Sequence, residues 1–90
     1  MNNSETSQFT ISLADISMAL GVSRTTVWRL FRGREMLHAR VHGRKYFTVA
    51  DVIIRLRQRP NHDPEIETTL LSIDQQRRQI RQHEAQRYDV

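Results

Sequence analysis

Apolar residues recur at spacings of three and four between residues 13 and 31, which is the periodicity of helices with one buried face. The pattern is interrupted at Gly21, and glycine enters positive φ without steric cost. Ser23 follows two residues later, where its hydroxyl can cap a second helix. The stretch therefore predicts two short helices, roughly Leu13–Leu20 and Arg24–Phe31, joined by a tight turn. The apolar positions of the two stripes are Leu13, Ile16, Leu20, Val22, Val27 and Leu30.

The segment before these helices carries a strand signal and a helix cap. Residues 1–8 are polar, and we expect them to be disordered. Phe9-Thr10-Ile11 alternates apolar and polar residues, so it is either a short strand or a hydrophobic lead-in to the helix. Ser12 and Asp15 have the spacing of a capping box, with Asp in place of Glu, and predict where the first helix begins.

A β-hairpin and a third helix are predicted after residue 35. Gly43 lies between two segments that contain β-branched or aromatic residues, which indicates a hairpin with a basic, exposed tip. Thr48 and Asp51 repeat the capping-box spacing and open a helix that should end near Arg59, because Pro60 prevents its continuation. The buried stripe expected on this helix is Val49, Val52, Ile53 and Leu56.

The last predicted helix is long. Asp63 is in the cap position and Pro64 is the first helical residue, and the helix should run to about Arg87. Its apolar positions alternate gaps of four and three, but this seven-residue pattern fails at Arg77, where a coiled coil would need an apolar residue. Either two copies pair along this stripe, or the stripe folds back onto the third helix. The stripe consists of Ile66, Leu70, Ile73 and Ile80.

Basic residues are concentrated in the first sixty residues. Residues 1–60 hold ten Lys/Arg against four Asp/Glu, a net charge of +6, whereas residues 61–90 hold four against six, a net charge of −2. The side of the second short helix that faces away from its apolar stripe carries three arginines and no acid, whereas an idle solvated face usually mixes signs. This distribution is typical of nucleic-acid binding, the alternative being a structural helix pair with solubilising charge. The residues on that side are Arg24, Thr25, Trp28, Arg29 and Arg32.

Two short helices joined at a glycine, with a basic second helix, have the form of a helix-turn-helix, whose second helix enters the DNA major groove. Residues 11–56 resemble the winged helix-turn-helix domains of the MerR/excisionase-like superfamily. This superfamily includes small phage and mobile-element regulators, excisionases and terminase small subunits. The resemblance covers about half of the chain and is carried, in order, by ALGVSRTTVWRL at 19–30, ARVHGRKYF at 39–47 and TVADV at 48–52.

The resemblance implies a mainly α fold with a small β-hairpin, namely a winged helix-turn-helix over residues 9–60 and a C-terminal helix over residues 61–90. Arg24 and Arg29 are the expected readers of base edges, most plausibly guanine O6 and N7. Trp28 is bulky for a base-reading position, so its packing against a sugar or against the wing is the alternative. Contacts to the DNA backbone are expected from Ser23, Arg32, Arg44 and Lys45. The full expected DNA-binding set is Ser23, Arg24, Thr25, Trp28, Arg29, Arg32, Arg44 and Lys45.

Nothing in the sequence indicates catalysis. The chain has no cysteine, and its four histidines show no metal-ligand spacing on one predicted helix. It has no paired carboxylates, Ser/His/Asp set or Gly-rich phosphate loop, so we expect no enzyme activity, metal, cofactor or small-molecule ligand. No apolar run is long enough to span a membrane and the N-terminus lacks signal-peptide features, so we expect a cytoplasmic, nucleoid-associated protein.

The predicted function is sequence-specific binding of double-stranded DNA by a small transcriptional regulator of phage or mobile-element type. One such domain has a small footprint, so we expect a homodimer or a DNA-assisted oligomer that uses the stripe of Ile66, Leu70, Ile73 and Ile80. An architectural protein of the excisionase or terminase-small-subunit kind is the alternative, because it would use the same DNA-binding domain. The alternative from another class is a protein-interaction adaptor that docks through Trp28, Phe31 and the C-terminal tail.

Overall fold

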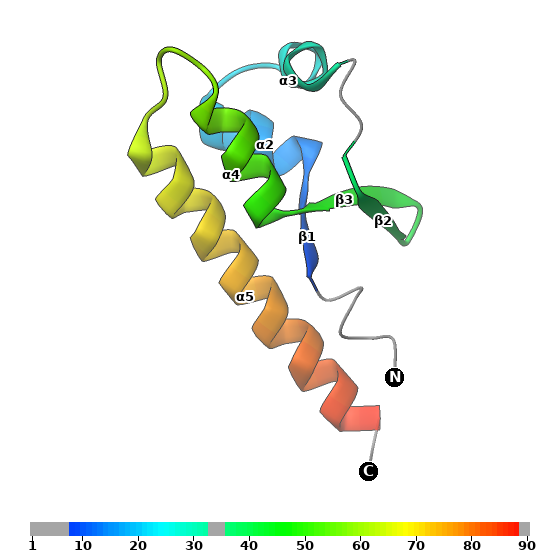
Figure 1. Cartoon of the computed structure of the whole chain (residues 1–90). Helices are drawn as coiled ribbons and strands as arrows, with labels where there is room; N and C mark the ends of the chain where they lie inside the picture. The colour runs from blue at the N-terminus through cyan, green and yellow to red at the C-terminus, as the bar shows by residue number, and fades with distance from the viewer. Residues whose placement is uncertain (1–7, 33–35, 89–90) are drawn as a thin grey trace.

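The computed structural model describes residues 8–32 and 36–88, with side chains described up to residue 80. The expected disorder of residues 1–8 therefore lies almost wholly outside the described residues. The elements are β1 (Phe9–Ser12), α2 (Leu13–Leu20), α3 (Arg24–Phe31), β2 (His38–Val41), β3 (Arg44–Thr48), α4 (Val49–Arg57) and α5 (Pro64–Tyr88). Over the described residues the fold is mixed α/β, with four helices and one antiparallel three-stranded sheet (Figure 1).

The sheet extends the predicted hairpin by one strand. β3 lies in the centre of the order β1-β3-β2, so Phe9-Thr10-Ile11 belongs to a true strand rather than to a lead-in. The hairpin turn is His42-Gly43, and both residues have positive φ, 52° and 78°. Two consecutive positive φ values define the type I′ turn, whose twist matches that of the flanking strands. The fold is rich in α-helix as expected, but the predicted hairpin is part of a three-stranded antiparallel sheet, so the fold is mixed α/β.

The helix boundaries follow the local capping signals. Ser12 caps α2 in a reciprocal capping box with Asp15, and Thr48 accepts a hydrogen bond from the Asp51 backbone N–H at the start of α4. Gly21 ends α2 in the left-handed conformation, with φ 69°, as the turn requires. The predicted starts of the helices are therefore confirmed. α4 ends at Arg57, about one half-turn before the expected end.

The core lies between the sheet, α2, α3, α4 and the first half of α5. The four stripe positions predicted for α4 are all buried. On α3, however, Leu30 is exposed, whereas Val27 is buried and Phe31 packs against the core. Val27 and Phe31 are four residues apart and face α2 together, so Leu30 falls on the flank of the helix, and Val22 in the turn is exposed too. The buried apolar residues are Ile11, Ile16, Val27, Phe47, Val49, Val52, Ile53, Leu56 and Leu70.

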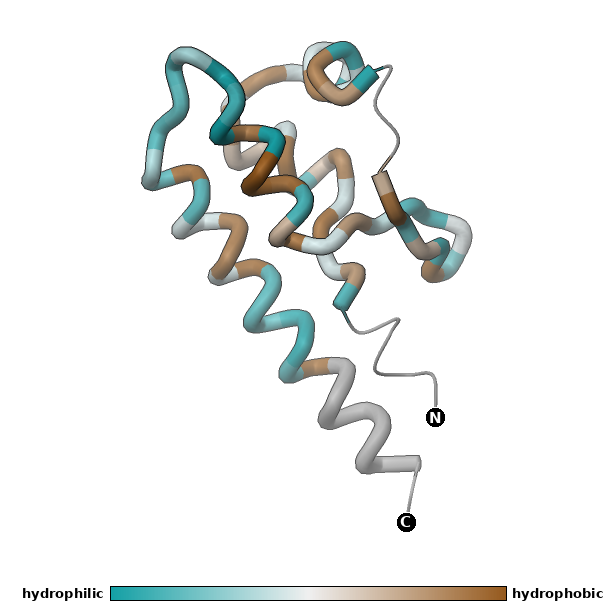
Figure 2. Tube along the Cα trace, viewed as in Figure 1, coloured by the Kyte–Doolittle hydropathy of each residue, from teal (hydrophilic) through white to brown (hydrophobic). Residues whose placement is uncertain are grey.

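α5 folds back onto the rest of the chain. Leu70 is fully buried in the core, and Ile66 and Ile73 pack against it. Three of the four residues expected to pair two copies are therefore covered within one molecule, which is the second of the two arrangements left open by the sequence. Ile80 remains 57% exposed. Hydrophobic positions recur along the first half of α5 and give way to hydrophilic ones further along (Figure 2).

Polar contacts join α5 to β1 and α2 at Arg77, where the apolar spacing of α5 is interrupted. The Arg77 guanidinium binds the Asp15 carboxylate, with 3.0 Å between Nη2 and Oδ1, and donates to the Thr10 carbonyl at 2.7 Å. The Thr10 hydroxyl donates to Asp74, one turn earlier on α5. Burial raises the pKa of the Asp15 carboxyl, but hydrogen bonds from Arg77 and Ser12 outweigh burial and hold the pKa below its ordinary value. The packed face of α5 thus extends as far as Arg77, where an ion pair replaces apolar packing.

A second ion-pair cluster joins the end of α4 to the start of α5. Arg57 donates to both carboxylate oxygens of Glu67, at 3.0 and 2.8 Å, and His62 contacts the same carboxylate. The hydrogen bonds from Arg57, followed by the contact with His62, lower the pKa of Glu67 to about 2 although partial desolvation opposes them.

Among the residues described, no helix is long and apolar enough to cross a membrane.

Candidate nucleic-acid interface

The packing of α3 determines which of its side chains face solvent. Val27 and Phe31 point into the protein, so the remaining sides of this two-turn helix lie at the surface. All the residues that the sequence assigned to its outward side are exposed, namely Arg24, Thr25, Trp28, Arg29 and Arg32. The predicted orientation of this helix, with its basic side outward, is therefore present in the structure.

Ser23 acts as the N-cap of α3. Its Oγ accepts a hydrogen bond from the Thr26 backbone N–H at 3.2 Å and shares another with Thr26 Oγ1 at 3.0 Å. The hydroxyl is exposed, but its role in the free protein is to satisfy a helix end. The capping prediction is confirmed, while phosphate binding by Ser23 stays a prediction.

The hairpin contributes a second group of cations. Arg44 and Lys45 begin β3 directly after the turn, and both are exposed. Arg40 lies opposite Lys45 in the antiparallel pairing and is exposed as well. The sequence did not single out Arg40, although a two-residue turn at 42–43 places it across from Lys45. Arg40 and Lys45 therefore lie on one face of the hairpin, and Arg44 lies on the opposite face next to the turn.

These cations have no acidic partner among the described residues. The ion pairs formed within the described residues involve Arg57, His62, Arg77 and Arg78, none of which lies on α3 or the hairpin. Asp15 and Asp51 are the only acids described before residue 60, and Asp15 is neutralised by Arg77. Among the residues that the structure describes, the positive charge of α3 and the hairpin is thus exposed and uncompensated, which favours an anionic partner. The six residues are Arg24, Arg29, Arg32, Arg40, Arg44 and Lys45.

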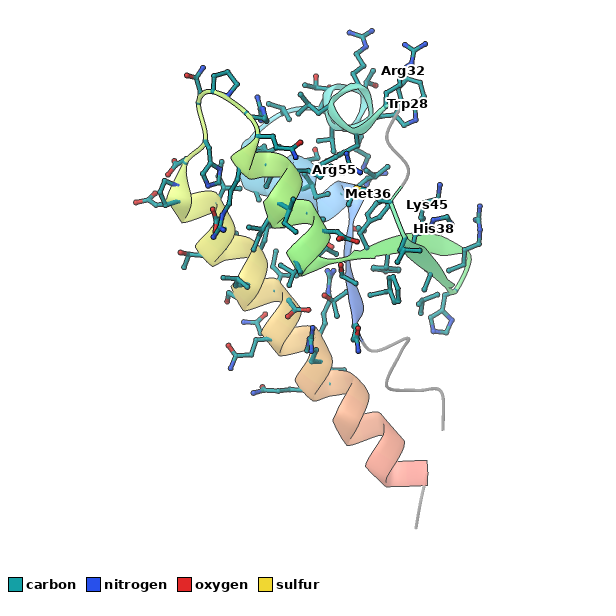
Figure 3. The ribbon with its side chains drawn as sticks, viewed as in Figure 1. Trp28, Arg32, Met36, His38, Lys45 and Arg55 are labelled. Atoms are coloured by element: carbon teal, nitrogen blue, oxygen red, sulfur yellow. The ribbon has the colours of Figure 1, made fainter. Side chains whose placement is uncertain are left out.

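α3 and the hairpin lie away from α5. In Figure 1 the hairpin projects on the side of the fold opposite α5, and α3 lies above it. Figure 3 shows Trp28 and Arg32 extending outward from α3, above the hairpin that carries Lys45 and His38. The His38 ring meets Phe47 edge-on, with 6.4 Å between the ring centroids. The structure thus presents one surface in which a helix and a hairpin both carry basic residues; we call it the basic surface.

Trp28 has a partner that the sequence analysis missed. The Arg32 guanidinium carbon lies 5.3 Å from the centroid of the Trp28 ring, within the range of a cation–π contact. Trp28 itself is 53% exposed. Neither of the two contacts considered for Trp28 included this arginine. The spacing of four residues on one helix is the signal that could have revealed it.

Comparisons of the chain with protein-family models, with curated proteins and with solved structures found no match. Among the side chains of residues 8–32 and 36–80, no three His, Asp or Glu residues gather in a way that could hold a metal ion.

Proposed function

We propose that the protein binds double-stranded DNA sequence-specifically, as a small winged helix-turn-helix regulator of transcription of phage or mobile-element type. In this proposal α3 is the recognition helix and the β2–β3 hairpin is the wing. The observation that carries it is the basic surface, where six cations are exposed without an acidic partner among the described residues. The order of two short helices, hairpin and helix supports the same function.

The geometry of DNA determines which residues would contact the bases and which would contact the phosphate backbone. The major groove is about 12 Å wide and admits one helix, so α3 would lie in it with Arg24 and Arg29 directed at base edges. Arg44 and Lys45 would hold the phosphate backbone from the hairpin tip, with Arg40 beside them. Ser23 would present the N-terminus of α3 to a phosphate while capping it.

We expect Lys45→Ala to weaken binding to all duplex sequences alike and to lower the slope of log affinity against log salt by about one. The reason is that a phosphate contact carries no base information. The measurement is selection from a random duplex library, followed by titration of the selected duplex at several salt concentrations. Arg59→Ala is the matched control, since it removes one exposed positive charge between α4 and α5, away from the basic surface.

The same selection separates the remaining functions. An enriched inverted repeat supports a dimeric regulator, and enriched direct repeats support the head-to-tail assembly of an architectural protein. Exposed Trp28 and Leu37, the latter 76% exposed, are the observations that favour a protein-interaction adaptor. Sequence-blind binding that salt abolishes, with Lys45→Ala indistinguishable from Arg59→Ala, would contradict DNA reading and favour the adaptor.

We also propose self-association as a homodimer or on DNA, now through the projecting end of α5. Its last turns extend beyond the rest of the fold, and Ile80 is exposed there (Figure 1). Ile80→Glu should lower the fraction of dimer in a sedimentation concentration series. Met18→Glu, at an exposed apolar position on α2, should leave the dimer intact. A strictly monomeric wild-type protein at high micromolar concentration, with and without DNA, would contradict self-association.

A further inference from the structure

Arg32 is supported by an aromatic ring, unlike the other arginines of α3. Its guanidinium lies over the ring of Trp28, four residues earlier on the same helix, at 5.3 Å from the centroid. Arg32 is also the C-cap residue of α3, with an extended backbone at φ −64° and ψ 140°. Its side chain therefore starts where the helix ends and is held against the last turn by the indole. Arg24 and Arg29 make no such contact with a described residue.

The contact orients the guanidinium without consuming its hydrogen bonds. A cation–π contact uses the face of the guanidinium, whereas its N–H donors point outward in the plane of the group. An arginine that is already restricted loses less conformational freedom when it binds. The Trp28–Arg32 pair thus presents a planar fork of donors in a prepared direction. This preorganisation favours a partner that presents two hydrogen-bond acceptors in the plane of the guanidinium.

The position of the pair fits the DNA-binding proposal. Figure 3 shows Trp28 and Arg32 extending outward from α3, above the hairpin that carries Lys45. Both residues are exposed on the helix proposed for the major groove, whereas Lys45, proposed for the backbone, lies on the hairpin.

We propose that Arg32, positioned by Trp28, is a specificity-determining residue that reads one guanine through its O6 and N7 atoms. This inference rests on the proposed function and deepens it, because the sequence analysis expected only a backbone contact from Arg32. A phosphate contact carries no base information, and lysine can supply it as a point charge. The two parallel donors of an oriented arginine match guanine O6 and N7 better than the compact ammonium of lysine does. Trp28 is a positioning residue that acts through Arg32.

Arg32→Lys is the variant that separates the two roles, since it keeps the charge but removes the planar fork. Affinity is measured for the duplex selected by the wild-type protein and for every single-base variant of it. We expect Arg32→Lys to lose about tenfold to a hundredfold of discrimination at one guanine. Affinity for unrelated duplex and the salt slope should be unchanged. Arg59→Lys, an exposed position between α4 and α5 outside the basic surface, is the matched control and should keep the full preference.

Trp28 is tested at the same base pair. Trp28→Leu should reduce discrimination at the guanine that Arg32→Lys affects and at no other position, and Trp28→Tyr should restore most of it because an aromatic face returns. Circular dichroism and thermal unfolding establish that each variant is folded, as expected for exposed positions. Since Trp28 is the only tryptophan, its fluorescence reports binding at the pair directly.

Two outcomes overturn the inference. If Arg32→Lys keeps the base preference, Arg32 is a phosphate ligand. If Trp28→Leu and Arg32→Lys change the preference at different base pairs, the two residues do not act together. A wild-type protein that enriches no sequence at all would overturn the proposed function itself, before any variant is compared. Failure of the inference and failure of the proposed function are therefore distinguishable.

Discussion

Replacing Arg77 with methionine is expected to lower the free energy of unfolding by about 3 kcal/mol. The guanidinium binds the Asp15 carboxylate and the Thr10 carbonyl, and Asp15 is only 5% exposed. Removing the cation leaves a buried carboxylate without its partner, which costs about 3–5 kcal/mol in a fully buried pair. The lower end applies because the Arg77 side chain is 36% exposed and water screens the pair. Urea denaturation followed by circular dichroism measures the change.

Two further variants test the cause of this loss. Asp15→Asn combined with Arg77→Met should recover part of the stability, because the unpaired charge is then absent while the Asn side chain can still accept at the helix N-terminus. Arg78→Met, which breaks the more exposed pair with Asp74 on α5, should cost much less. Equal losses for Arg77→Met and Arg78→Met would show that the buried contact contributes no more than a surface pair.

The same pair makes stability depend on pH. The folded pKa of Asp15 is below its ordinary value of 3.8, so its contribution is fully present above that value and is lost as the pH falls through the folded pKa. The wild-type protein should therefore lose stability below about pH 4 more steeply than Arg77→Met. Glu67, with a pKa of about 2, loses its contribution in the same acidic range in both proteins. Parallel urea midpoints for the two proteins from pH 6 to pH 3 would contradict the assignment.

Leu70→Ala is expected to cost about 2–5 kcal/mol, the range for deleting a buried leucine side chain. Leu70 is fully buried between α5 and the core, so the truncation removes packing and leaves a cavity. Because the contact lies within one molecule, the loss should not depend on protein concentration. Leu71→Ala, on the exposed side of the same helix, is the matched control and should cost well under half as much. A loss that grows on dilution would instead place Leu70 between two copies.

The parts of the fold that sequence reasoning predicted are those encoded within a few residues. Ser12 and Thr48 cap helices because a hydroxyl reaches the backbone three residues ahead, which the local sequence determines. The stripe of α4 was predicted in full because a helix with a single buried side leaves little choice of face. The type I′ turn at Gly43 follows from local backbone preference in the same way.

The parts that could not be predicted depend on partners far apart in the chain. Asp15 and Arg77 are 62 residues apart, so nothing near Arg77 indicates that it would pair with a buried carboxylate. The apolar stripe of α5 is equally suited to a second copy and to the chain's own core, because both bury the same face. The sequence could not choose between them. Leu30 was misplaced since a two-turn helix has few positions from which to fix the direction of its buried side.

The exposed side of α3 was predicted more completely than the core. The basic surface of α3 is the complement of a buried side defined by Val27, so its residues follow once that side is known. The Trp28–Arg32 contact was missed, because pairing at a spacing of four also depends on the rotamers of two long side chains. Arg40 was missed since its place opposite Lys45 needs the exact register of the hairpin.

Two hydrogen bonds, from Arg77 to the Thr10 carbonyl and from the Thr10 hydroxyl to Asp74, join the first strand of the fold to its last helix. During synthesis the N-terminal strand emerges first, and the residues that fasten it emerge more than sixty positions later. Contacts of such high sequence separation form late, because a long loop must close before they contribute. The contacts between β1 and α5 can therefore form only after Asp74 and Arg77 have emerged from the ribosome. Arrest of a nascent chain short of residue 74 should yield a fold that proteases cleave readily at β1, even though α3 and the hairpin have already been made.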